Sequence, residues 1–160
     1  MNAQRLALAG AALAALALTG TAFGHSAHSS AASTVVTTKQ TPLGTILVTS
    51  SGQTLYLDSA DKPGHPACTG GCLTAWPPLK ASGAPKAAGG AKASLLATTK
   101  IAGGITQVVY NGHQLYTFKT DTKSNPTSGE GVNGFYAVSP SGAKVPKPAT
   151  KKKPSSTPGY

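Results

Sequence analysis

The sequence predicts an all-β protein, a small sandwich or barrel-like domain built from two repeated β-hairpin units. Short runs of β-branched and aromatic residues alternate with turns rich in glycine, proline, asparagine and serine, which is typical of strands joined by tight turns. The chain also repeats itself at a displacement of sixty positions. Leu55 and Tyr56 return as Leu115 and Tyr116, and Asp61 returns as Asp121.

Each repeat is expected to contain one hairpin, at residues 45–58 and 105–118. The second has Asn111-Gly112 at its turn, the strongest short hairpin signal, because a type I′ turn needs positive φ at both central residues. A further strand is expected at 134–138, a turn at 139–142 and a short return strand at 143–145, whereas residues 93–101 suit either a helix or a strand.

Strand alternation places Leu55 and Leu57 on one face and Tyr56 and Asp58 on the other. The large apolar residues of the predicted strands and of the Trp-Pro-Pro-Leu segment should form the core. These are Ile46, Val48, Leu55, Leu57, Trp76, Leu79, Val108, Leu115, Phe118, Phe135 and Val138.

The predicted domain occupies residues 42–145, with repeat 1 at about 42–80 and repeat 2 at about 102–143. Residues 1–24 read as a secretory signal peptide, because one arginine precedes an apolar run that ends in small residues. Residues 25–41 have few large apolar side chains and suggest a flexible linker. We therefore expect a protein secreted to the cell envelope or beyond, monomeric and without a membrane span once the signal is removed.

The positive charge is concentrated at the C-terminus. The chain has 14 basic and 4 acidic residues, a formal net charge of +10, whereas residues 41–143 carry seven lysines against four acids. Residues 146–160 are rich in Lys, Pro, Ser and Thr and predict a basic disordered tail. Such a tail suits contact with an anionic wall polymer, or serves solubility alone. The sequence has no nucleic-acid-binding motif.

Two cysteines in an exported protein favour one disulfide, here between Cys68 and Cys72. So short a closed loop contributes only about 2 kcal/mol in the chain-entropy model. The alternative is a metal or haem site that uses His65, Cys68, Cys72 and His113, with copper as the metal. The spacing matches neither covalent haem attachment nor a structural zinc site.

An enzymatic function is not expected. Asp61 and Asp121 are candidates for a glycosidase-type carboxylate pair by their position alone, and that position just after a strand favours capping of a turn. The sequence has no recognisable nucleophile with its base.

Aromatic residues on a β scaffold either stack on sugars or build the core. Trp76, Tyr110 and Tyr136 are the candidates for a ligand-binding surface, and Tyr56 and Tyr116 should share one role because they occupy equivalent repeat positions.

The motif Tyr116-x-Phe118-x-x-Asp121, the preceding 111–115 segment, and Cys68-x-Gly70-x-Cys72 leading to Trp76-Pro-Pro-Leu together resemble a bacterial family. It is the family known as the secreted repeat of unknown function, related to predicted lipoproteins, and the resemblance covers residues 42–143. It implies two repeats, an envelope location and no established enzymatic activity.

The sequence departs from that family in two ways: Asp58 stands where the motif has an aromatic residue, and the lipid-bearing cysteine is absent. The function expected is a secreted, envelope-associated binding or structural protein without a cofactor. The alternative is a redox accessory protein that binds copper or haem, since some relatives of the family occur beside cytochrome or cupredoxin-like modules.

Overall fold

The computed structural model describes residues 33–145. The predicted signal peptide, the first part of the predicted linker and the predicted basic tail lie outside these residues.

The described chain is almost entirely β, as predicted. Its strands are β1 (Val35–Thr41), β2 (Gly44–Thr49), β3 (Tyr56–Asp58), β4 (Lys86–Ala87), β5 (Leu96–Lys100), β6 (Thr106–Tyr110), β7 (His113–Gln114) and β8 (Phe135–Ala137). One single-turn helix, α1 (Cys72–Ala75), and three 3-10 turns, η1 (Ala93–Leu95), η2 (Ala102–Gly104) and η3 (Val132–Gly134), complete it. The residues left open between helix and strand therefore contain η1 followed by β5.

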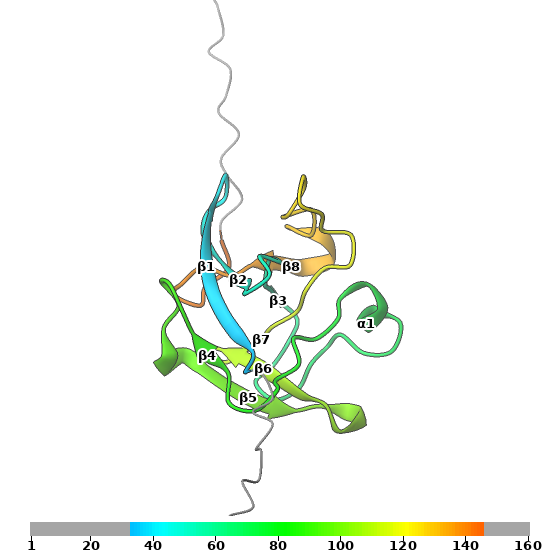
Figure 1. Ribbon diagram of the computed structural model, residues 1–160. Helices are drawn as coiled ribbons and strands as arrows, with labels where there is room; N and C mark the ends of the chain where they lie inside the picture. Colours follow the sequence, from blue (N-terminus) through cyan, green and yellow to red (C-terminus); the bar gives the residue numbers. More distant parts are fainter. Residues whose placement is uncertain (1–32, 146–160) are drawn as a thin grey trace, which may run out of the picture.

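The strands form three small sheets, ordered β2-β1-β4, β3-β8 and β5-β6-β7. In Figure 1, β1 and β2 stand at one side, β5 and β6 run across the opposite end, and α1 projects from a loop away from both. The first sheet is built mainly from β1 and β2 at the start of repeat 1, and the third from β5, β6 and β7 at the start of repeat 2. β4 lies between the repeats in the sequence, and the pair of β3 with β8 joins them.

The predicted linker over residues 25–41 is wrong at its C-terminal end. β1 occupies Val35–Thr41 and pairs antiparallel with β2, from Val36 opposite Thr49 to Thr41 opposite Gly44. Val36 is fully buried, while the lysine and glutamine near the end of the strand are exposed. This strand buries few side chains, so the scarcity of large apolar residues was misleading. The β-branched run at residues 34–38 was the sign of a strand that the linker prediction did not use.

Both predicted hairpins form at their turns and then separate. Asn111 and Gly112 have φ of 49° and 81°, as the predicted type I′ turn requires, and β6 pairs with β7 beyond it. In repeat 1, Val48 bridges to Thr54, but β3 then leaves β2 and pairs with β8.

A segment of the other repeat enters where each hairpin opens. Val138 donates its N–H to Leu55 and accepts the N–H of Leu47. In repeat 2, Leu79 likewise donates to Leu115 and accepts from Val108. The two repeats are therefore interlocked rather than placed side by side.

Two hydrophobic clusters lie on opposite faces of β3. Leu55 and Leu57 belong to a mainly aliphatic cluster, and Tyr56 belongs to an aromatic one that contains Trp76, Tyr116 and Phe135. The predicted alternation is therefore correct, but both faces are buried rather than one. All the predicted core residues lie in these clusters, with Leu79 and Phe118 only partly buried at their edges.

Candidate functional site at the repeat interface

Tyr56 and Tyr116, the equivalent tyrosines of the two repeats, face each other at the centre of the molecule. The N–H of each donates to the carbonyl of the other, with both N···O distances at 2.9 Å. Nearby, the ring of Trp76 stacks on that of Phe135 with centroids 3.8 Å apart. Trp76 and Phe135 begin the two segments that enter the opposite hairpins, so the repeats are related by an approximate two-fold axis here.

The side chains of the repeat motif cross this axis. The hydroxyl of Tyr56 donates to Asp121 at 2.8 Å, and that of Tyr116 donates to Asp61 at 2.9 Å. The tyrosine and the aspartate of one copy of the motif therefore do not meet; each binds its counterpart in the other copy. We call these two contacts the crossed Tyr–Asp pairs.

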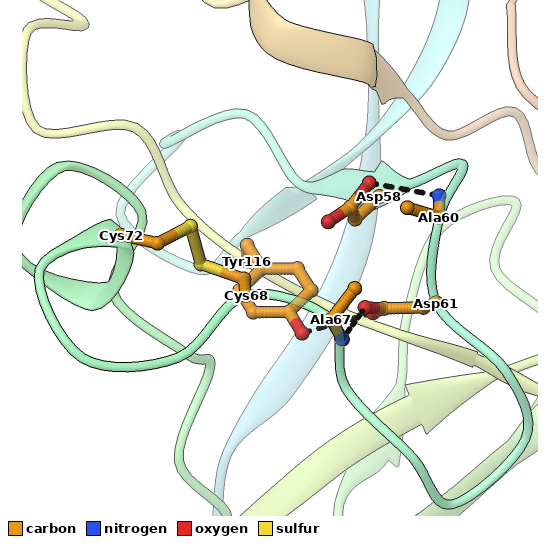
Figure 2. The surroundings of a disulfide bond; sticks show 7 residues. All are labelled: Asp58, Ala60, Asp61, Ala67, Cys68, Cys72 and Tyr116. Atoms are coloured by element: carbon orange, nitrogen blue, oxygen red, sulfur yellow. Dashed lines mark hydrogen bonds between the residues drawn. A yellow bond between two sulfur atoms is a disulfide. The ribbon is translucent and has the colours of Figure 1, made fainter.

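The second oxygen of each aspartate caps the loop that follows it. Asp61 Oδ1 accepts the N–H of Ala67 at 2.7 Å, as Figure 2 shows beside the Tyr116 contact. Asp121 Oδ1 accepts the N–H of Ser128 at 2.9 Å and its hydroxyl at 2.7 Å. These contacts match the interpretation of the aspartates as turn caps. Both oxygens of each carboxylate accept a hydrogen bond from the protein.

Burial raises the pKa of Tyr56 and of Tyr116 far above the ordinary value, and the hydrogen bond to the aspartate adds to the effect. Burial also raises the pKa of Asp61, although the bonds from Ala67 and Tyr116 oppose the shift. Both phenols consequently remain protonated at neutral pH and act as donors, not as nucleophiles or bases.

The expected disulfide joins Cys68 to Cys72, with the two Cα atoms 5.4 Å apart. It lies directly after Ala67, and Cys68 is buried in the aromatic cluster that contains Tyr116 (Figure 2). The disulfide thus shapes the loop that caps Asp61.

Two of the four residues considered for a metal site are paired with each other. The sulfurs of Cys68 and Cys72 are bonded to each other and are not available as thiolates. Within residues 33–145, no three His, Cys, Asp or Glu side chains gather in a way that would hold a metal ion. His65 is exposed and His113 is half-buried on β7.

Two of the three aromatic residues considered for a ligand surface are in the interior, which corrects that interpretation. Trp76 is 2% exposed because its ring is stacked on Phe118 as well as on Phe135. Tyr110 is fully buried and donates its hydroxyl to the carbonyl of Pro140 at 2.8 Å. Tyr136 alone is partly accessible, beneath the ammonium of Lys144.

The family described as a secreted repeat of unknown function matches this chain twice, at residues 37–80 and 97–138. The chain belongs to that family. Each match begins inside a strand, β1 or β5, so the repeat unit starts with that strand. Comparison with curated proteins and with solved structures finds no match.

The chain has, in its described residues, no helix long and apolar enough to cross a membrane.

The replacement of the motif's aromatic residue by Asp58 in repeat 1 changes the contacts at that position. Phe118, its equivalent in repeat 2, stacks on Trp76, whereas Asp58 is buried and accepts the N–H of Ala60 at 2.9 Å.

One feature of the surface was not predicted: an open hollow of about 600 Å³ at the junction of the two repeats. It is lined by β1, the turn after β2 and the loop after Asp121. Its residues include Lys39, Ser51, Gln53, Asp121, Thr122 and Lys123. The positions of the first group, 39–53, and of the second, 121–123, are at least 68 residues apart along the chain, and no sequence pattern linked them.

Proposed function

We propose that this secreted repeat protein is a non-enzymatic, monomeric module that binds anionic polymers of the cell envelope. The observation that carries the proposal is the distribution of charge. All nine lysines of residues 33–145 are exposed, while the four acidic residues are buried or half-buried.

The acidic side chains are engaged internally. Asp61 and Asp121 hold the crossed Tyr–Asp pairs, Asp58 caps the N–H of Ala60, and Glu130 accepts the N–H of Ala137 at 2.7 Å. The charge presented to solvent by this part of the chain is therefore almost wholly positive. A surface of this kind attracts polyanions over distances of about a Debye length.

The tail strengthens the same interaction. Residues 146–160 contain four further lysines. An exported protein meets phosphate- and carboxylate-bearing wall polymers, and these are the partners we propose rather than nucleic acid.

We propose a non-enzymatic role because the carboxylates of the two aspartates are already hydrogen-bonded within the protein. Glycosidase-type acid–base catalysis, the only kind that the sequence suggested, requires a carboxyl group that can reach a substrate proton. Both oxygens of Asp61 and of Asp121 already accept hydrogen bonds from the protein.

The test is co-sedimentation of the full chain with purified cell-wall fragments at increasing salt. We expect binding that weakens steeply as salt rises, because each neutralised anion releases a counterion. Deletion of residues 146–160 should weaken binding and flatten its salt dependence. The deletion begins after Val145 because that side chain is buried in the aromatic cluster. Failure of the full chain to sediment with the fragments at low salt would refute the proposal.

A further inference from the structure

We propose that the hollow at the repeat junction is a specific binding site for a phosphodiester-linked polyol or sugar chain. This inference rests on the proposed function and assigns it to one place on the folded domain. The hollow is open, has a volume of about 600 Å³, and lies between repeat 1 and the loop that follows Asp121.

One of the crossed Tyr–Asp pairs and a neighbouring hydrogen bond hold the two sides of the hollow together. Tyr56 binds Asp121, and the hydroxyl of Thr54 donates to the carbonyl of Pro126. Both contacts hold the loop of repeat 2 against the hairpin of repeat 1, so the walls of the hollow come from a well-packed junction. A preformed site avoids part of the ordering cost of binding.

Its two lysines break the symmetry of the repeats. Leu47 and Val108 occupy equivalent places in the two hairpins, because they accept the N–H of Leu55 and of Leu115. Thr38 pairs with Leu47 and Thr98 pairs with Val108, so Lys39 of β1 corresponds to Thr99 of β5. By the same sixty-residue displacement, Lys123 corresponds to Pro63. Residues that the two repeats share build the interlocked core, whereas these lysines are exposed and have no such role.

The charge of the hollow indicates the kind of anion. Lys39 and Lys123 supply two positive charges and Asp121 one negative charge, whose oxygens are already bonded to Tyr56 and Ser128. A net charge of +1 suits a chain with widely spaced single charges better than a compact, highly charged anion.

The neutral lining indicates the remainder of the ligand. Ser51, Gln53 and Thr122 line the hollow with two hydroxyl side chains and an amide. The hydroxyl of Ser51 bonds to that of Thr49 and the hydroxyl of Thr122 to that of Ser124, and each hydroxyl can make a further hydrogen bond. These groups donate and accept hydrogen bonds, as the hydroxyls of a polyol or sugar do. Phosphodiester oxygens would bind the two ammonium groups as point charges.

The experiment is calorimetric titration of the full chain with purified poly(glycerol phosphate). The test variant is K39Q/K123Q, and the matched control is K86Q/K92Q, which removes the same charge from exposed lysines elsewhere. We expect the test variant to bind about ten-fold more weakly and its salt dependence to fall by about 1.4 units of slope, because two anion contacts are lost. The control should remain within about two-fold of the wild type, and thermal unfolding should show both variants folded.

Each outcome separates this inference from the proposed function. Equal losses in the two variants would mean diffuse attraction, which overturns the site and leaves the proposed function standing. Binding of oligogalacturonate but not of poly(glycerol phosphate) would overturn the phosphodiester assignment. If the wild type binds neither these polymers nor wall fragments, the proposed function itself is wrong.

Discussion

Tyr56 and Tyr116 show why the repeat motif takes the form of a tyrosine and an aspartate five positions apart. Within one copy the two side chains serve different neighbours, and the contact between them is made only across the two repeats. The prediction that both tyrosines share one role is confirmed by their equivalent hydrogen bonds. Their partners were not identifiable from spacing, because the relevant distance is between copies and not along the chain.

Removal of one phenol hydroxyl tests this arrangement. Tyr56→Phe leaves the half-buried carboxylate of Asp121 without its donor, and hydrogen bonds to charged groups contribute about 1.5–3 kcal/mol. We expect the free energy of unfolding in urea to fall by about that amount, and Tyr116→Phe to behave alike because it has the equivalent bond. The control is Tyr136→Phe, at a half-buried ring outside the crossed pairs, with an expected change within about 0.5 kcal/mol. Equal effects at Tyr56 and Tyr136 would refute the role given to the pairs.

At the scale of elements, the turns were predicted correctly from their residues, whereas the pairing partners of the strands were not. Asn111-Gly112 forms its expected turn, and residues 45–49 form a strand. Yet each hairpin opens after a few residues to admit Leu79 or Val138 from the other repeat. Local sequence encodes where a strand turns, whereas the choice of neighbour depends on which distant segment completes its hydrogen bonds and covers its side chains.

The loop between β3 and α1 gives a prediction about the disulfide. Cys68 and Cys72 close a loop of few residues, so reduction should cost only about 2 kcal/mol of stability. Urea unfolding with and without dithiothreitol measures the change, and the far-ultraviolet circular dichroism spectrum should stay the same. Loss of the folded spectrum on reduction would show that the disulfide holds the fold together and does more than shape the loop.

At the scale of the molecule, the inward position of the acidic residues makes stability depend on pH. Burial raises the pKa of Glu130, whose Oε1 is buried and finds no hydrogen-bond partner among the described residues. The folded chain therefore holds this proton more tightly than the unfolded chain. Its contribution to stability is present at low pH and is lost as pH rises from the unfolded pKa, about 4.3, through the raised folded pKa.

The variant Glu130→Gln removes that titration while keeping an oxygen that accepts the N–H of Ala137. Urea unfolding at pH 4 and pH 7 should show a smaller decline in stability for the variant than for the wild type. Lys92→Gln, at an exposed lysine, serves as a control for the loss of one charge. An unchanged or steeper decline in Glu130→Gln would contradict the effect of burial on this carboxyl group.

The sequence alone determined the all-β class, the two repeats, the disulfide pairing and part of the core. These properties follow from side-chain period, turn residues and apolar volume, which are local. Only the tertiary structure decided that β1 is part of the domain, that the tyrosine and aspartate pair across the repeats, and that Tyr110 is interior. The hollow at the junction also belongs to this second group. Each of these features depends on contacts between segments far apart in the chain. Such contacts are concentrated at the centre of the molecule because the two repeats are interlocked there.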